Sequence, residues 1–348
     1  MSEKKMTSIG GQAVIEGIMM KGPDKIAVAV RKPDGEIIID ESENKIKGGV
    51  RKIPLVRGVF AFVDSMVTGV KALMFSANFY DEDGTAKDKV SEDKKDSENK
   101  NESEDRNVSE DKEKVNDIEK SESKTLKDAK KEESNEEMPG WMMALTVLTS
   151  VCISIGLFIA LPNIIAGFLV PNVEDANGNV FLYNLVESIV KIVIFLTYLI
   201  LVSKLKDIQR VFEYHGAEHK TIFCYENGED LTVENVKKFQ RFHPRCGTSF
   251  LMFVIVISII VFSVIGRFDS KIINVLVRIA LLPVVAGISY EIIRFAGKHT
   301  DNKWISWLNK PGMMLQKLTT REPDEKQIEV AIAALKAVLP KEKDADNW

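Results

Sequence analysis

The sequence predicts an α-helical integral membrane protein with four transmembrane helices, a small α+β cytoplasmic unit and an amphipathic helix. The first supporting observation is four apolar stretches, each close to the roughly 20 residues that cross a bilayer. The second is an uneven charge distribution in this chain of 348 residues, because residues 81–137 hold 22 of its 51 acidic and 13 of its 47 basic residues. These features exclude a uniform soluble globule, and a net charge of −4 disfavours a nucleic-acid-binding protein.

The first unit, residues 1–80, is predicted to be cytoplasmic and to contain a β-hairpin. Its segment IGGQAVIEGIMMKGPDK, residues 9–25, is rich in Gly and Met and is expected to form a structured loop. Two β-branched runs then flank Pro33-Asp34-Gly35. A turn sequence of this kind between two such runs predicts a hairpin.

Residues 56–78 are predicted to form the amphipathic helix. Arg57, Asp64 and Lys71 recur every seven residues and so share one stripe of a helix whose other faces are apolar. Such a helix lies at a membrane surface or packs against a membrane bundle, and both placements are open. A lipid-facing span is less favourable, because three charges inside one span are costly.

Residues 81–138 are predicted to be a disordered charged linker. Residues 81–137 contain no aromatic residue and few apolar residues. A segment of this composition buries too little apolar surface to offset the entropy lost on ordering. We therefore expect it to be a solvated spacer.

Four membrane helices are predicted after the linker, two within residues 139–203 and two within residues 249–296. The first is expected to bend or end near Pro162-Asn163. Glu187 and Lys191 are spaced i,i+4 in the second, and the fourth carries Arg278 and Glu291, so we expect these charges to neutralise one another. The predicted helices are residues 141–161, 181–203, 249–266 and 274–294.

Basic residues in the connecting segments predict the orientation. The loop of residues 171–180 has no Lys or Arg, whereas the loop of residues 204–248 has eight. The positive-inside rule therefore places both termini on the cytoplasmic side of the membrane. A chain with three cysteines cannot build a disulfide framework, which agrees with a reducing compartment.

The tail of residues 297–348 is predicted to be cytoplasmic and to contain a helix that starts after Thr320 and Pro323. One apolar face is expected to dock on the membrane domain or on the N-terminal unit. That face consists of Ile328, Ile332, Leu335 and Leu339.

The loop of residues 204–248 holds three of the four histidines and two of the three cysteines. His215, Glu218 and His219 have the His-x-x-Glu-His spacing of inverted zinc peptidases. On a helix both imidazoles would lie on one face and could hold a metal, while Glu218 activates water. We expect zinc, with His243 or Cys246 completing the ligands, and Glu291 is a further candidate.

The predicted function is therefore that of a membrane-bound, metal-dependent enzyme, hydrolytic in type and of unknown substrate. Glu218 would be the general base, and Arg245 could stabilise an anionic intermediate or a phosphate. The substrate would be a lipid, a lipid-linked metabolite or a membrane peptide reached at the cytoplasmic membrane face.

Three alternatives remain open for the same residues. The histidines could bind lipid phosphates or loop carbonyls without any metal. Cys246 could be a nucleophile with His219 as its base. The His/Cys cluster could also be structural, in a non-enzymatic accessory protein that serves as a scaffold for a membrane protein complex.

Five segments of the chain resemble the bacterial YqhQ family, which is defined by a domain of unknown function. They are residues 10–23, 56–78, 213–228, 242–250 and 318–339. The resemblance covers nearly the whole chain except the acidic linker, which looks like an insertion. It implies a multi-pass membrane protein of a kind sometimes described as a metal-dependent enzyme. It marks as signature positions Glu16, His215, Glu218, His219, His243, Arg245 and Cys246.

Overall fold

The computed structural model describes residues 6–44, 53–80, 140–170, 180–265, 268, 270–298, 302–340 and 346. The predicted linker of residues 81–138 lies outside the described residues. So do residues 171–179, which are nearly all of the predicted loop between the first two membrane helices.

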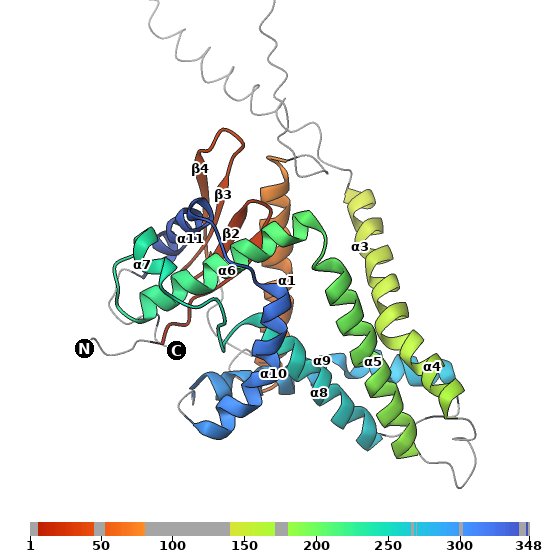
Figure 1. The fold of residues 1–348 in the computed structure, drawn as a ribbon. Coiled ribbons are helices and arrows are strands. Elements are labelled where there is room, and N and C mark those ends of the chain that lie inside the picture. The colour runs from red at the N-terminus through yellow and green to blue at the C-terminus, as the bar shows by residue number, and fades with distance from the viewer. Residues whose placement is uncertain are drawn as a thin grey trace, which may run out of the picture. The chain divides into compact units, whose positions relative to one another are not determined.

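A four-stranded antiparallel sheet forms the N-terminal part of the fold, with strands in the order β1-β2-β3-β4 (Figure 1). The predicted hairpin is confirmed as β3 (Lys25–Arg31) and β4 (Ile37–Glu43), with Gly35 at a φ of 92° in the turn. The prediction of a loop over residues 9–25 was wrong. Most of that segment is a second hairpin, β1 (Gly10–Val14) and β2 (Gly17–Lys21).

Both faces of the sheet are covered. One face packs against α6 (Lys206–Glu226) and α11 (Glu325–Val338), through buried Ile18, Met20, Ala27 and Ala29. The other face packs against α1 (Val56–Ala77), through buried Val14, Met19, Val28 and Val30. Because side chains alternate along a strand, β2 and β3 contribute to two cores at once, which fixes their register.

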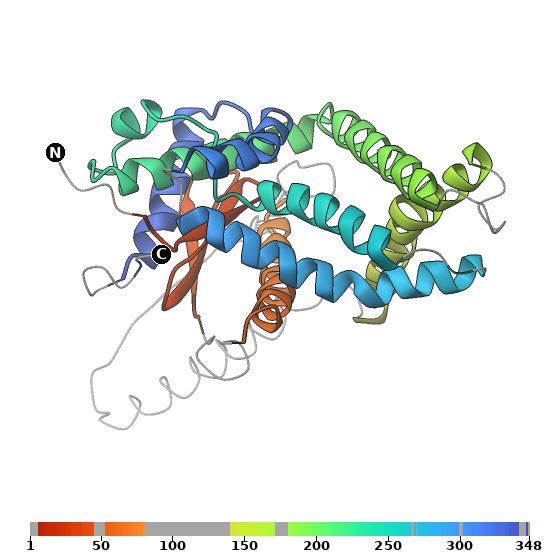
Figure 2. The ribbon, with the colours of Figure 1, turned by 90° about the horizontal axis from the view of Figure 1, so that it is seen from below.

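Among the described residues, five helices are long and apolar enough to cross a membrane, so the predicted count of four is not confirmed. Four of them are α1, α5 (Val180–Val202), α8 (Gly247–Ile265) and α9 (Lys271–Lys298). Helices α8 and α9 run side by side (Figure 2). The fifth candidate, residues 145–169, starts within α3 (Gly140–Ile155).

The expected bend near Pro162 occurs as a change of helix type. A π-helical turn, η2 (Gly156–Ala160), joins α3 to α4 (Leu161–Leu169). Pro162 cannot donate a backbone hydrogen bond, and π-turns are a common way to absorb such a defect. The helical segment therefore continues past Pro162, eight residues beyond the predicted end at residue 161.

Two of the three charges on the predicted stripe of helix α1 face the rest of the protein, whereas Lys71 is exposed. Arg57 pairs with Glu291 of α9, and Asp64 pairs with Lys21 of β2. Gly69 lies against Gln12 of β1, where a Cβ atom would meet the side-chain amide. The opposite side of α1 exposes large apolar residues, which are Phe60, Phe62, Val63, Met66, Val67, Val70, Leu73 and Met74.

Three of the four charges predicted inside the membrane helices pair with one another, whereas Glu291 pairs with Arg57 of α1. Arg278 of α9 forms an ion pair with Glu187 of α5, and the Lys191 Nζ lies 4.0 Å from the same carboxylate. Both cations also lie over the ring of Phe262 in α8, at 5.4 Å and 5.2 Å from its centroid. The expected neutralisation, within α5 and between α5 and α9, is confirmed by these contacts.

The loop predicted for residues 204–248 is largely helical. Helix α6 is separate from α5, because residues 203–205 form a turn between them, and the short α7 (Val233–Lys237) follows. A further helix, α10 (Lys303–Thr319), was not predicted. The predicted C-terminal helix is α11, which is capped by Asp324 and docks on the sheet and on α6 rather than on the membrane helices.

We predict that replacing Glu187 by Leu destabilises the protein by roughly 3–5 kcal/mol, because two buried cations then lose their shared carboxylate. Replacing Arg278 by Met should cost less, because Lys191 remains near Glu187. Thermal unfolding of the detergent-purified protein measures both. The exposed Lys206, replaced by Met, is the control and should change stability by less than about 0.5 kcal/mol. Equal losses in the two buried variants would contradict the shared-carboxylate arrangement.

Candidate metal centre

Helix α6 is held in place by a close contact at Gly216. A Cβ atom at this position would lie 2.0 Å from the carbonyl oxygen of Arg321. The Arg321 amide also donates to the carbonyl of Phe212, at 2.8 Å. Gly216 costs helix stability of about 1 kcal/mol relative to Ala, and this contact is the reason that glycine occupies the position.

Three potential metal ligands converge beside this contact. His215 and His219 project from α6, and Cys246 precedes α8. One ligand atom from each residue lies within 4.8 Å of the other two. The predicted pairing of the two histidines with Cys246 is therefore present as a three-donor group.

Hydrogen bonds to the backbone set the tautomers of both histidines. The Nδ1 of His215 lies 2.8 Å from the carbonyl of Thr319, and the Nδ1 of His219 lies 2.6 Å from the carbonyl of Arg241. A carbonyl can only accept, so each Nδ1 carries the proton and donates it. In a neutral ring, Nε2 then carries the free lone pair. Metal-binding histidines commonly have this arrangement, with the other ring nitrogen donating its proton to an acceptor.

Cys246 is surrounded by groups that favour its thiolate. Its Sγ lies 3.2 Å from the Nε2 of His215 and accepts from the Thr248 amide and hydroxyl, at 3.4 Å and 3.3 Å. Burial raises the pKa of Cys246, but His219 and His215 outweigh this and hold it well below its ordinary value. Burial likewise lowers the pKa of His215, but the Cys246 charge raises it to about 9. Both pKa shifts favour a thiolate paired with an imidazolium.

Glu218 is buried next to these ligands. Its Oε2 makes no hydrogen bond to the described residues, and Gly11 of β1 approaches it so closely that a Cβ atom there would lie 3.0 Å from the carboxyl carbon. Burial raises the pKa of Glu218, mainly by disfavouring the charged carboxylate. A buried carboxyl with an unused oxygen is suited to accept a proton.

His243 and Arg245 belong to a neighbouring ion-pair network rather than to the three-donor group. Arg245 pairs with buried Glu226, and the Nε2 of His243 lies 3.6 Å from the same carboxylate. The Nδ1 of His243 accepts from the Arg245 amide at 3.3 Å, and burial lowers the pKa of His243 to about 4. The structure thus places Cys246, and not His243, in the three-donor group, although the ring centroid of His243 lies 5.6 Å from that of His219.

The other acidic candidates have structural partners. Glu16 lies in the β1–β2 turn with a φ of 47°, pairs with Arg210 and accepts from the hydroxyl of Tyr214 at 3.1 Å. It therefore ties the sheet to α6. Glu291, considered as a ligand, is instead bound by Arg57 and by the backbone amide of Leu55.

Several residues that position the site were not found from the sequence. Gln316 of α10 accepts from the amide of His243 and donates to its carbonyl, both at 2.8 Å. The carbonyls of Thr319 and Arg241 orient the two ligand histidines. Backbone carbonyls cannot be predicted from the sequence, because every residue type has one. The helix over residues 303–319 was not predicted because Pro311 and Gly312 lie in its interior and usually disfavour a helix.

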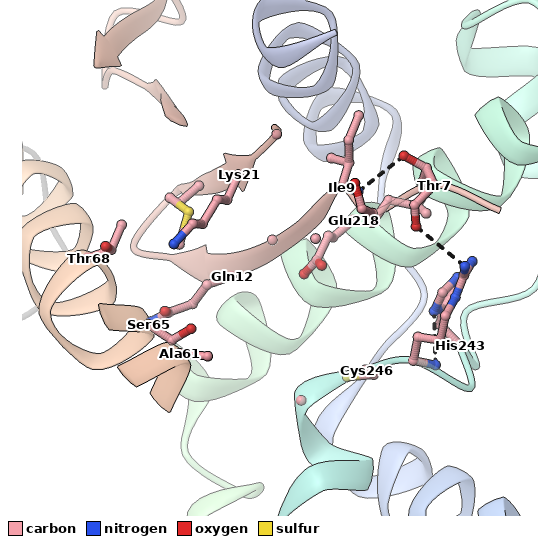
Figure 3. Close-up of a pocket in the computed structure, with 18 of the residues that line it drawn as sticks. Thr7, Ile9, Gln12, Lys21, Ala61, Ser65, Thr68, Glu218, His243 and Cys246 are labelled. Atoms are coloured by element: carbon pink, nitrogen blue, oxygen red, sulfur yellow. Dashed lines mark hydrogen bonds between the residues drawn. The ribbon is translucent and has the colours of Figure 1, made fainter. Parts of the chain in front are cut away.

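A cavity of about 940 Å³ opens at the three-donor group. It is bounded by β1 and β2, α1, α6, the segment before α8 and the C-terminal part of α9. Figure 3 shows Cys246 and His243 on one side of this cavity, Lys21, Ser65 and Thr68 on the other, and Glu218 between them. The donors therefore face a space large enough for a small-molecule or lipid headgroup.

The chain is similar over most of its length to proteins that carry no functional description. Residues 53–341 match the family model described as "Protein of unknown function (DUF1385)". The chain is 33% identical to "Uncharacterized protein YqhQ" of Bacillus subtilis over 343 residues, which cover 97% of this chain and 95% of that protein. No solved structure matches the chain.

We predict that replacing Glu226 by Gln destabilises the protein by roughly 3–5 kcal/mol at pH 7, because Arg245 is left buried without its partner. Burial raises the pKa of Glu226, but His243 and Arg245 hold it below its ordinary value. Its contribution is therefore complete above the unfolded pKa of about 4.3 and is lost as pH falls through the lower folded pKa.

The measurement is thermal unfolding of wild type and variant between pH 7 and pH 3. Exposed Glu229, replaced by Gln, is the control and should leave stability unchanged. A difference between wild type and Glu226→Gln that does not shrink at low pH would contradict this assignment.

Proposed function

The chain belongs to the DUF1385 family, and we propose that this member is a membrane-bound, zinc-dependent hydrolase acting at the cytoplasmic face of a bacterial cytoplasmic membrane. The observation that carries the proposal is the convergence of His215, His219 and Cys246, with both Nδ1–H groups donated to backbone carbonyls. Such a donor set favours binding over chance proximity, since each Nδ1–H already has an acceptor, which leaves Nε2 as the atom available to a metal once it is deprotonated.

The proposed topology has four spans and both termini in the cytoplasm. We assign α1 to the membrane surface rather than to a fifth span, because Arg57 and Asp64 on its inner stripe pair with α9 and with the sheet. A helix that forms an ion pair with a strand at mid-length is unsuited to cross hydrocarbon. Its exposed apolar side fits an interfacial helix.

The donor types favour zinc. Two imidazole nitrogens and one thiolate suit a borderline-soft divalent ion, and three protein ligands leave one position open, as in catalytic rather than structural zinc sites. Zinc bound there would supply Lewis acidity toward water and toward a substrate carbonyl or phosphoryl oxygen.

Glu218 is the proposed general base. Glu218 lines the cavity, and its buried Oε2 has no hydrogen-bond partner among the described residues, so this carboxyl would take a proton from water that reaches it. Gly11 leaves room for this carboxyl. Arg245 also lines the cavity, and we retain it as the residue that stabilises negative charge, held rigidly by Glu226.

A second candidate is a cysteine-dependent hydrolase. The specific observation that favours it is the 3.2 Å contact between the Cys246 Sγ and the His215 Nε2, the arrangement of a nucleophile and its base. The base would then be His215 rather than the expected His219. The accessory alternative requires instead a closed four-ligand site, with no role for Glu218.

We predict about one zinc per chain in the detergent-purified protein, measured by elemental mass spectrometry. The double variant His215→Ala/His219→Ala should lose it, because two of three donors are removed, whereas Glu218→Gln should keep it. His299, the fourth histidine, lies outside the described residues and provides the matched control His299→Ala, which should retain zinc. Absence of stoichiometric zinc in folded wild type would contradict the proposal.

Catalysis is tested with lipid extracts of the expression host, incubated with zinc-loaded wild type or Glu218→Gln and compared by mass spectrometry. Products formed by wild type alone support hydrolysis. Zinc-edge absorption that reports four protein ligands, with identical behaviour of both proteins, would favour the accessory alternative. Turnover that persists without zinc but is lost in Cys246→Ser would favour the cysteine hydrolase.

A further inference from the structure

The cavity carries an excess of basic side chains at the end that α1 and α9 enclose. Arg57 and Arg294 both line it there, next to Tyr290. Arg57 is paired with Glu291, three residues before Arg294 on α9, and the same carboxylate also interacts with Arg294. Two guanidinium groups thus share one carboxylate, which leaves a net positive charge at this end.

Arg294 differs from the other basic residues of the cavity. Lys21 pairs with Asp64, and Arg245 pairs with Glu226. Within the part of the chain that the structure describes, Arg294 has no ion pair and no hydrogen bond from its half-buried side chain. A guanidinium offers five donors, and in a partly enclosed cavity they need an anionic acceptor.

The same end of the cavity meets the apolar surface of α1. Phe60 lines the cavity and is still 42% exposed, so it stands at the opening. Next to it begins the exposed apolar side of α1, which includes Val63, Met66 and Val67. Both α1 and α9 are apolar enough to contact a bilayer. A ligand that entered here would have its polar end at Arg294 and its apolar end along α1.

We infer that this end of the cavity binds the phosphate of an anionic membrane lipid, with Arg294 and Arg57 contacting the phosphate oxygens and α1 contacting an acyl chain. The inference rests on the proposed function in naming the class of substrate. A phosphate ester matches the planar fork of arginine, and an attached acyl chain matches the apolar opening. The rest of the headgroup then extends along the cavity toward Glu218 and Cys246.

The test is isothermal titration of the full-length, zinc-loaded protein in detergent with three probes. These are dioctanoyl phosphatidylglycerol, dioctanoyl phosphatidylcholine and inorganic phosphate. We expect phosphatidylglycerol to bind most tightly and Arg294→Gln to weaken it about tenfold, with Arg294→Lys in between. The control Lys298→Gln changes an exposed residue of the same helix that does not line the cavity and should bind like wild type.

Thermal unfolding of each variant in detergent shows that it is folded. Equal affinity of wild type and Arg294→Gln would overturn the inference, as would equal affinity for phosphatidylcholine. Inorganic phosphate that binds as tightly as phosphatidylglycerol would also overturn it, since the acyl chain would then contribute nothing.

The titration also separates this inference from the proposed function. The variant His215→Ala/His219→Ala should still bind phosphatidylglycerol, because Arg294 is not a zinc ligand. Zinc bound without lipid binding would overturn only the inference. Lipid binding without zinc in wild type would overturn only the proposed function.

Discussion

The candidate metal centre depends on the approach of the Arg321 carbonyl to α6 at Gly216. This contact, together with the hydrogen bond from the Arg321 amide to Phe212, holds the backbone of residues 319–321 against the helix. The Thr319 carbonyl is thereby placed at the Nδ1 of His215. Any side chain at position 216 would move that backbone away and release the imidazole. Glycine lowers the stability of the helix at this position, but its lack of a side chain allows the contact that fixes the orientation of His215.

Buried charges are treated in two ways in this structure. Glu187 and Glu226 each lie opposite an arginine, so their burial is compensated. Glu218 is equally buried, yet it forms no ion pair with a lysine or arginine among the described residues. A buried carboxyl without such a partner costs stability, and groups of this kind are found disproportionately at functional sites. In the proposed function, this contrast supports Glu218 as the general base.

The sequence predicted the features that follow from a periodic pattern of apolar residues or from a characteristic residue type. These include most of the apolar helices, the hairpin around Gly35, the α11 face and the convergence of His215 and His219 with Cys246. It failed where backbone geometry decides. The β1–β2 turn uses Glu16 at a positive φ, a position at which glycine would be the usual signal, and α10 contains Pro311-Gly312. The carbonyls that orient the histidines could not be predicted, because any residue supplies one.

Helix α1 links the cavity to the bilayer by simple geometry. Two of its charges, Arg57 and Asp64, contact α9 and β2, whereas its large apolar residues are exposed together with Lys71. The helix therefore forms a wall of the cavity with one side and can rest on lipid with the other. Since β1 packs against α1 and also carries Gly11 beside Glu218, displacement of α1 from the membrane would alter the wall opposite the metal ligands. In the proposed function, membrane association is thus a condition for an intact site as well as a means of reaching the substrate.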